Sequence, residues 1–85
     1  MFYTVYILYS TTFQKYYTGY TGDELTNRLQ KHNSNHKGYT GNAKDWEVVY
    51  SKEYVDKSQA IIVEKKIKKR GAKRYLVDID NRLSG

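Results

Sequence analysis

The sequence has 85 residues, a length at which we expect one small domain over residues 1–85 with a thin core. It contains no cysteine, which excludes disulfide bonds and thiolate metal sites and is typical of the reducing cytoplasm. Its formal net charge of +6 favours an anionic partner, such as nucleic acid, over a cationic one.

The N-terminal part of the chain predicts a β-hairpin. A run of β-branched and aromatic residues predicts a strand over Phe2–Tyr9, and a second strand is expected over Tyr16–Thr21 after a polar connection. The first run is too short to span a membrane and lacks the basic start of a signal peptide, so we expect a cytoplasmic protein without a membrane association. Gly19 lies inside the second strand, where a glycine often marks the close approach of another backbone or a ligand.

Residues 23–33 predict a helix. Asp23 is expected to cap its N-terminus, and Leu25 and Leu29 form its apolar stripe. The segment that follows, residues 34–44, is polar and contains glycine, so we expect a loop there.

The second half predicts one strand and two helices, over Glu47–Val55, Asp56–Arg70 and Lys73–Leu83. Asp56 and Gln59 have the spacing of a capping box, with aspartate in place of the usual serine or threonine, and Gly71 is expected to end the first of these helices. The order β-β-α-β-α-α predicts an α+β fold, in which a small antiparallel or mixed sheet is flanked by helices.

Positive charge is concentrated toward the C-terminus. Residues 1–55 carry six Lys or Arg against five Asp or Glu, which gives +1, whereas residues 56–85 carry nine against four, which gives +5. Such a segment is typical of a surface that binds a polyanion, but a lysine-rich helix can also serve only solubility. The charge pattern alone leaves both interpretations open.

Glu64 is an acidic residue on an apolar helix face. At helical spacing it falls within the arc of the apolar residues of that helix, which are Ala60, Ile61, Val63 and Ile67. Burying a carboxylate is costly unless it is paired, hydrogen-bonded or bound to a metal. We therefore expect Glu64 either to pair with Lys68, four residues later, or to face a cleft as a metal ligand or an acid–base group.

Four further polar residues can be brought together by the predicted elements. Arg28 and His32 are four residues apart and share a helix face, although an ordinary solvated helix side is the alternative. Tyr6 and Tyr17 have a spacing that allows them to lie on neighbouring strands of the hairpin. If the register places both phenols on one face, they meet Arg28, His32 and Glu64.

These residue types suit phosphodiester chemistry. Arginine binds a phosphate and stabilises developing charge, and a lone carboxylate together with phosphate oxygens can hold a largely hydrated Mg²⁺ ion. A phenol or an imidazole can take a proton from water. Because the ordinary pKa of a phenol is about 10, a phenol acting as a base needs help from cations such as Arg28 and Lys31.

In this pattern the chain resembles the GIY-YIG nucleases, also called the URI domain. It is most similar to the small stand-alone branch related to the N-terminal domain of excinuclease C. The resemblance extends from Tyr3 to Arg70 and is carried by four motifs in order, which are Thr4-Val5-Tyr6, Tyr17-Thr18-Gly19, the helix segment Asn27–Asn33, and Glu64 within residues 58–70. The family fold is a three-stranded antiparallel sheet with flanking helices, which agrees with the predicted order of elements.

The resemblance implies a metal-dependent endonuclease that hydrolyses phosphodiester bonds in DNA with low sequence specificity, in DNA repair or recombination. It makes Tyr6 and Tyr17 the catalytic tyrosines, without deciding which of them activates water. It assigns Arg28 to stabilisation of the transition state and His32 to proton transfer or hydrogen bonding. Glu64 is implied to bind one divalent cation, Mg²⁺ or Mn²⁺.

The resemblance also implies assignments that rest on less specific motifs. Tyr39 matches a position that often carries an active-site tyrosine or histidine. The implied partner is nucleic acid, DNA before RNA, and no protein partner is implied. With no separate DNA-reading domain in the sequence, we expect phosphate contacts from the basic residues of the second long helix, which are Lys65, Lys68, Lys69 and Arg70. Two positions depart from the family pattern: Thr4 replaces a glycine of the first signature, and Asn81 is a weak match to a late asparagine of several members.

Two other functions fit the same residues. A non-catalytic module that binds DNA or RNA keeps the fold and the basic surface, and it predicts salt-sensitive binding without cleavage. An interaction domain with a purely structural polar cluster predicts that Glu64→Gln lowers stability more than it changes any effect on nucleic acid.

Overall fold

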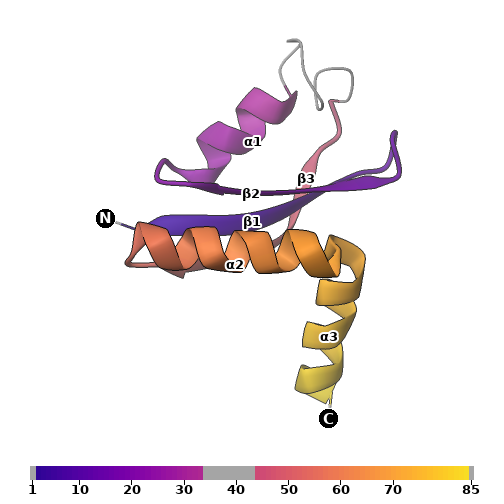
Figure 1. Ribbon diagram of the computed structural model, residues 1–85. Coiled ribbons are helices and arrows are strands. Elements are labelled where there is room, and N and C mark those ends of the chain that lie inside the picture. Colours follow the sequence, from indigo (N-terminus) through magenta and orange to yellow (C-terminus); the bar gives the residue numbers. More distant parts are fainter. Residues whose placement is uncertain (1, 34–43, 85) are drawn as a thin grey trace.

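The computed structural model describes residues 2–33 and 44–84 and has the expected order β-β-α-β-α-α (Figure 1). Its six elements are β1 (Tyr3–Ser10), β2 (Lys15–Thr21), α1 (Leu25–Asn33), β3 (Glu47–Tyr54), α2 (Lys57–Arg70) and α3 (Ala72–Ser84). The α+β prediction is therefore confirmed, and the boundaries differ from the expected ones by one or two residues. Within the described ranges, no helix is long and apolar enough to cross a membrane.

The three strands form one antiparallel sheet in the order β2-β1-β3. The antiparallel alternative of the sequence analysis is thus the correct one. β1 lies in the centre, and its residues Val5 to Leu8 are at most 1% exposed. β2 and β3 are the two edges of this sheet. No further strand lies beyond β2 in the described sheet, so long side chains from the two faces can approach one another at that edge.

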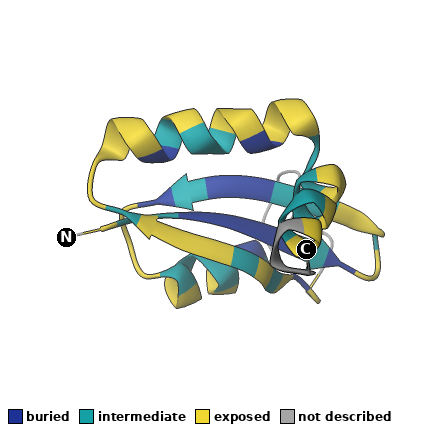
Figure 2. Ribbon diagram, turned by 90° about the horizontal axis from the view of Figure 1, so that it is seen from below, coloured by how far each residue is buried: buried dark blue, intermediate teal, exposed yellow. Residues whose placement is uncertain are grey.

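Alternation along β1 sends its side chains into two separate cores. Val5 and Ile7 pack with Ala60 and Ile67 of α2 on one face. On the other face, Tyr6 and Leu8 pack with Trp46 and against the apolar stripe of α1. Figure 1 shows α1 and α2 on opposite sides of the sheet, and Figure 2 shows burial concentrated in β1 and β2, whereas β3 and the outer helix faces are largely exposed.

Asp56 is the N-cap residue of α2, as predicted, but its capping box and the predicted cap at Asp23 are wrong. Asp56 has the extended backbone of an N-cap residue, but its side chain makes no cap hydrogen bond, so the capping box does not form. The backbone carbonyl of Asp56 accepts the N–H of Ala60, which is the first hydrogen bond of the helix, and Asp56 is exposed. The Asp23 carboxylate accepts the N–H of the adjacent Glu24, and α1 begins only at Leu25.

The corner between α2 and α3 has a well-defined structure. Gly71 ends α2 as expected, with a φ of 93° that favours glycine, and its N–H donates to the carbonyl of Ile67. The Arg70 guanidinium donates to both carboxylate oxygens of Asp78 on α3, at 2.8 and 3.0 Å. This bidentate pair braces the corner, and Figure 1 shows α3 turning away from α2 at that point.

Candidate active site

The pairing of β1 with β2 places two phenols on one face of the sheet. Tyr6 lies opposite Gly19, and Leu8 lies opposite Tyr17, so Tyr6 and Tyr17 are diagonal neighbours. Their ring centroids are 6.5 Å apart and the rings are inclined by 28°. Both rings belong to the core on the α1 side.

Gly19 allows the Tyr6 ring to lie directly over β2. A Cβ atom at Gly19 would be 2.8 Å from the Tyr6 hydroxyl oxygen, 2.9 Å from Cζ of the same ring and 3.2 Å from the Tyr17 ring. These distances are shorter than ordinary carbon contacts, so any larger residue would displace a phenol. The close approach expected at this glycine therefore exists, and the approaching group is the Tyr6 side chain.

His32 of α1 joins the two phenols from above the sheet. It is 8% exposed, and its Nε2 lies 3.3 Å from the Tyr6 hydroxyl, with the tautomer deciding which group donates. Its ring centroid is 4.6 Å from that of Tyr17. The i to i+4 relation predicted for Arg28 and His32 directs both side chains toward this cluster.

Arg28 brings a cation that no described carboxylate neutralises. It forms no ion pair with any residue in the described ranges, and its Nε is buried there without a hydrogen-bond partner. A half-buried guanidinium of this kind retains donors for an anion such as a phosphate.

The pKa of the Tyr6 phenol is raised above its ordinary value. Burial is the main cause, and the charges of Tyr17 and Glu64 add to it. The adjacent Arg28 guanidinium opposes the rise through its polar contact with the phenol and through its charge. The net direction is upward, which favours the neutral phenol, a group that can both donate and accept hydrogen bonds.

Glu64 approaches the site from α2, on the other side of the sheet. Its side chain is 12% exposed, and one carboxylate oxygen lies 3.7 Å from the ammonium of Lys68. The ion pair expected at i to i+4 is therefore present, and the carboxylate is also close enough to Tyr6 to raise the pKa of its phenol. Glu64 is thus neither turned outward nor fully enclosed.

The fit of a divalent cation depends on Glu64. In the part of the chain that the structure describes, no three His, Asp or Glu side chains are grouped so as to hold a metal ion. A complete protein cage is therefore not formed by these residues. A hydrated Mg²⁺ needs only one or two carboxylates together with substrate phosphate oxygens, and the partly accessible Glu64 suits that mode of binding.

A hollow of about 330 Å³ lies beside this cluster, between β2 and the α2–α3 corner. Its lining residues are Tyr16, Tyr17, Thr18, Lys68 and Ala72. Tyr17 and Lys68 therefore connect the phenol cluster with Glu64 around the β2 edge of the sheet.

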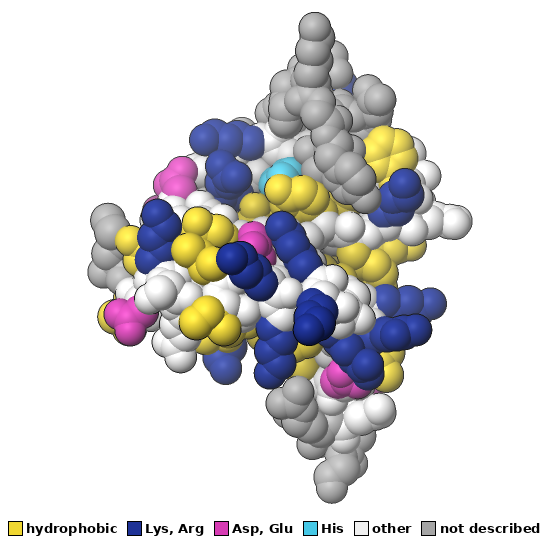
Figure 3. All heavy atoms as spheres, viewed as in Figure 1, with side chains coloured by type: hydrophobic (Ala, Val, Ile, Leu, Met, Phe, Trp, Pro, Cys, Tyr) yellow, Lys and Arg dark blue, Asp and Glu magenta, His cyan; other side chains and the backbone are white. Residues whose placement is uncertain are grey.

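Basic side chains surround this edge. Figure 3 shows lysine and arginine side chains gathered over α2 and around the α2–α3 corner. The expected phosphate-contacting residues of α2 are all exposed, namely Lys65, Lys68, Lys69 and Arg70. Arg70 is engaged by Asp78, whereas Lys65 and Lys69 make no ion pair with any described residue.

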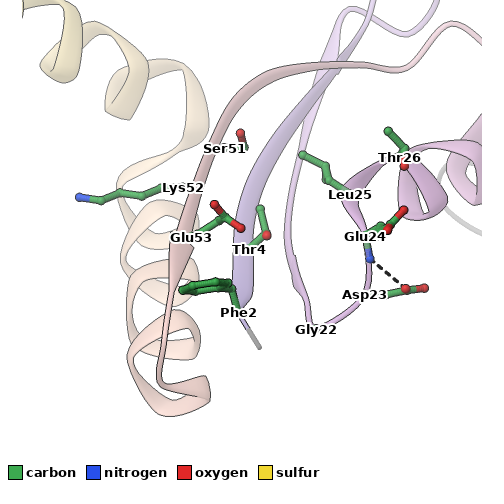
Figure 4. Close-up of a pocket in the computed structure, with 10 residues that line it drawn as sticks. All are labelled: Phe2, Thr4, Gly22, Asp23, Glu24, Leu25, Thr26, Ser51, Lys52 and Glu53. Carbon is green, nitrogen blue, oxygen red and sulfur yellow. Dashed lines mark hydrogen bonds between the residues drawn. The ribbon is translucent and has the colours of Figure 1, made fainter.

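A larger hollow of about 630 Å³ lies away from the phenols, where α1 begins. Figure 4 shows Phe2 and Thr4 of the N-terminal segment across from Leu25. Three carboxylates line this hollow, those of Asp23, Glu24 and Glu53. Lys52 is the one basic residue that also lines it, so acidic charge predominates, which disfavours a polyanion.

Sequence reasoning missed two residues that hold the site in place. The Asn33 side chain accepts the N–H of Trp46 at 2.8 Å and donates to the carbonyl of Trp46 at 3.0 Å. Trp46 in turn packs edge-on against Tyr17, with ring centroids 6.5 Å apart. The sequence offers one signal for this contact, a lone tryptophan just before a predicted strand, but no pattern connects it with Asn33.

Two sequence predictions remain without a place in the site. Tyr39 lies outside the described residues. Asn81 is an exposed residue of α3, the helix that packs at the α2–α3 corner.

The chain is similar to known proteins over the elements described above. The family model described as the GIY-YIG catalytic domain matches residues 2–76. The solution NMR structure of the UPF0213 protein BH0048 from Bacillus halodurans is similar, with a TM-score of 0.57 and 26% identity, over 93% of this chain and 85% of that one. No protein with a curated description matches the chain. The family match includes every element that contributes to the cluster of phenols, His32, Arg28 and Glu64.

Proposed function

Because this chain belongs to the GIY-YIG nuclease family, we propose that it is a metal-dependent endonuclease that hydrolyses phosphodiester bonds in DNA with low sequence specificity. The observation that supports the proposal is the cluster of two phenols, an imidazole and a guanidinium on the α1 side of the sheet, with Glu64 near enough for its charge to raise the pKa of the Tyr6 phenol. Each of these groups has a task in phosphoryl transfer, and their order along the chain is that of the family motifs.

The different surroundings of the two phenols suggest different roles. Tyr6 is 1% exposed and neutral, so it serves to hold His32 through the 3.3 Å contact. Tyr17 lines the hollow and is the phenol that meets the substrate. Its hydroxyl orients the attacking water, and His32 accepts the proton that this water loses. A P–O bond then forms to the water oxygen, and the bond to the leaving oxygen breaks.

Charge is stabilised from both layers of helices. Arg28 donates to the non-bridging phosphate oxygens, where negative charge grows during the reaction. Glu64 would hold one Mg²⁺ or Mn²⁺, which, when bound, supplies Lewis-acid stabilisation of the phosphate and of the leaving oxygen. The ion pair between Lys68 and Glu64 would break when the Lys68 ammonium moves to the phosphate, which leaves the carboxylate to the cation. The Lys68 side chain is 56% exposed and has a long flexible stem, so it has room to move.

Nicking of supercoiled plasmid tests this proposal. We expect cleavage with Mg²⁺ or Mn²⁺ that chelation abolishes. Tyr17→Phe should lower the rate by about 100-fold or more, because the attacking water loses the hydroxyl that orients it. Tyr20→Phe is the matched control, because Tyr20 lies on the same strand but packs in the core on the α2 side, and it should keep the rate.

Glu64→Gln is the decisive variant for the metal. It keeps the shape of the side chain but removes its charge, so we expect metal-dependent nicking to disappear while the folded structure persists. Full Mg²⁺-dependent nicking by this variant would remove Glu64 from the mechanism.

A non-catalytic nucleic-acid-binding module is the second candidate. The ion pair between Glu64 and Lys68 favours it, because a neutralised carboxylate binds a cation less strongly. That function predicts salt-sensitive binding of DNA or RNA with no cleavage under any metal, and no effect of Tyr17→Phe on affinity.

A further inference from the structure

We propose that Asp45 is a positioning residue for the reaction, because its carboxylate ties the turn of the β1–β2 hairpin to the segment that carries Trp46. Trp46 in turn contacts the two elements that supply Tyr17 and His32. The proposal rests on the function proposed above and adds a residue that acts through other residues rather than on the substrate.

The Asp45 carboxylate accepts three hydrogen bonds from the hairpin. Its Oδ1 accepts the Ser10 hydroxyl at 2.7 Å, and its Oδ2 accepts the backbone N–H of Thr12 at 2.8 Å and the Thr12 hydroxyl at 3.0 Å. The Ser10 hydroxyl also accepts the N–H of Phe13 at 3.2 Å, so the carboxylate and the turn share one network. The hydrogen bond from Ser10 is the main cause that lowers the pKa of Asp45, followed by that from the Thr12 backbone, so the network favours the charged carboxylate.

This network extends the connection of β1 with β3 beyond their last paired residues. Those residues are Tyr9 and Glu47, and Ser10 follows Tyr9 directly, while Asp45 lies two residues before Glu47. Ser10 is fully buried, and a hydrogen bond from a hydroxyl to a carboxylate is stronger than one between neutral groups. We therefore expect Asp45 to hold the segment before β3 in one position relative to the hairpin.

Trp46 connects this network with the two rings of the site. Its ring packs edge-on against Tyr17, with centroids 6.5 Å apart, and against Phe13 of the hairpin turn, at 6.3 Å. Its backbone N–H and carbonyl are both hydrogen-bonded to the side chain of Asn33, the residue after His32. Trp46 is 2% exposed, so its ring has little room to move independently of its backbone. A shift of this segment therefore displaces the phenol and the imidazole relative to each other.

The proposed reaction depends on the relative position of these two rings. The centroids of Tyr17 and His32 are 4.6 Å apart, and the mechanism needs one group to orient the water whose proton the other accepts. A displacement of about 1 Å between such groups can lower a rate by about 100-fold. The lysines expected to contact the phosphate lie on α2, which packs on the other face of the sheet. Loss of the Asp45 carboxylate should therefore lower kcat and leave KM nearly unchanged.

Asp45→Ala tests the inference with two measurements on the full chain. In the nicking assay we expect kcat to fall by about 10- to 100-fold, with KM within about twofold of its original value. In aromatic NMR spectra we expect the ring signals of Tyr17 and His32 to move and the nuclear Overhauser effect between them to weaken.

The NMR measurement separates this inference from the proposed activity. Unchanged ring signals in Asp45→Ala would overturn the inference whether or not the protein cleaves DNA. A purely structural role predicts a lower free energy of unfolding with kcat and ring signals of the folded protein unchanged, and that result would also overturn it. If the unsubstituted protein does not cleave DNA but the signals move, only the proposed activity is lost, and positioning by Asp45 stands.

Matched variants separate the hydrogen bonds from the charge. Asp45→Asn keeps one oxygen that can accept both donors of Thr12, so it should recover most of the rate lost in Asp45→Ala. Glu47→Ala removes an exposed carboxylate two residues further along and should keep both the rate and the ring signals. Equal losses in Glu47→Ala and Asp45→Ala would show that the network is not the cause.

A titration of the unsubstituted protein gives a readout that needs no variant to fold. The NMR signal of the Asp45 side-chain carbonyl carbon reports its ionisation. We expect the pKa of Asp45 below its ordinary value, because the donors of Ser10 and Thr12 stabilise the charged carboxylate. A pKa at or above the ordinary value would show that the network does not persist in solution and would remove its role in the site.

Discussion

Tyr6 and Tyr17 are the same chemical group in different surroundings. Tyr6 is enclosed by β2, His32 and Arg28, while Tyr17 is half-buried and borders the hollow. Burial of Tyr6 raises the pKa of its phenol, so the two tyrosines offer different chemistry although both lie on the same face of the sheet.

The raised pKa of Tyr6 has a measurable consequence at high pH. The folded state holds this proton more tightly than the unfolded chain, so the stabilisation is fully present below the ordinary tyrosine pKa of about 10 and is lost as the pH rises through the higher folded value. In a titration followed by phenolate absorbance, Tyr6→Phe should remove one group that ionises late. Loss of a group that ionises at or below the ordinary pKa would contradict the burial argument.

Gly19 should tolerate no side chain. Gly19→Ala places a methyl group within 3 Å of the Tyr6 ring, which is too buried to move freely, so we expect a loss of about 1–3 kcal/mol in the free energy of unfolding. Denaturant unfolding measures it.

A double-mutant cycle identifies the cause of that loss. In a Tyr6→Ala background the two contacts shorter than 3 Å disappear and only the 3.2 Å contact with the Tyr17 ring remains, so Gly19→Ala should then cost less. An equal cost in both backgrounds would show that the effect arises from the β2 backbone instead.

Individual residues were predictable from sequence where the signal was local. Glu64 interrupts an apolar helix face, and that pattern predicted a carboxylate with restricted exposure, which the 12% exposed side chain confirms. Asn33 and Trp46 gave no such signal. Their two hydrogen bonds join positions 13 residues apart, and only the folded chain brings them together.

Among the elements, α1 depends most on a few specific contacts. It has nine residues and packs one narrow apolar stripe, so its intrinsic stability is small. Asn33, its last residue, links it to the start of β3 through two hydrogen bonds with the backbone N–H and carbonyl of Trp46. His32 is the adjacent residue, and its position depends on that attachment.

Removing the attachment should affect both stability and chemistry. Asn33→Ala leaves the Trp46 backbone groups unpaired, so we expect a loss of about 1–3 kcal/mol and a changed emission from Trp46, the only tryptophan. Asn33→Asp should not restore the native state, because a carboxylate accepts from the N–H but cannot donate to the carbonyl.

Asn27→Ala makes the same change at an exposed position of α1 and is the control. Unaltered tryptophan emission in Asn33→Ala would show that Trp46 is held by packing alone.

The types and order of the elements were predictable, but the ends were less so. Alternating and helical patterns placed all six elements, and Gly71 ended α2 as expected. Asp56 takes the N-cap position of α2 as predicted, but without a side-chain hydrogen bond, because such a bond depends on the side-chain rotamer. The Asp23 carboxylate accepts the N–H of the adjacent Glu24 instead of capping α1. The hairpin pairing of β1 with β2 was predictable from their short connection, whereas the pairing of β1 with β3 depends on long-range contacts that no local pattern specifies.

For the whole molecule, charge asymmetry should control affinity for nucleic acid. Lys65 and Lys69 are exposed on α2 near the hollow, and neither is paired with a described carboxylate. For single strands, the slope of log affinity against log salt should become shallower by about 0.7 for each lysine that contacts a phosphate. We expect this change on Lys65→Gln and Lys69→Gln, measured by anisotropy over a salt series.

Lys52→Gln removes the same charge from β3, the opposite edge of the sheet, and should leave the slope unchanged. A similar change for all three variants would indicate that net charge, rather than a defined surface, governs binding.

The site takes its groups from two layers that pack on opposite faces of the sheet. Tyr6 packs in the core on the α1 side and contacts His32, whereas Glu64 belongs to α2, which packs on the other face. The relative position of the acid and the phenol therefore depends on how both helices pack on the strands. A core substitution under either helix can change the geometry of the site without altering any of its residues.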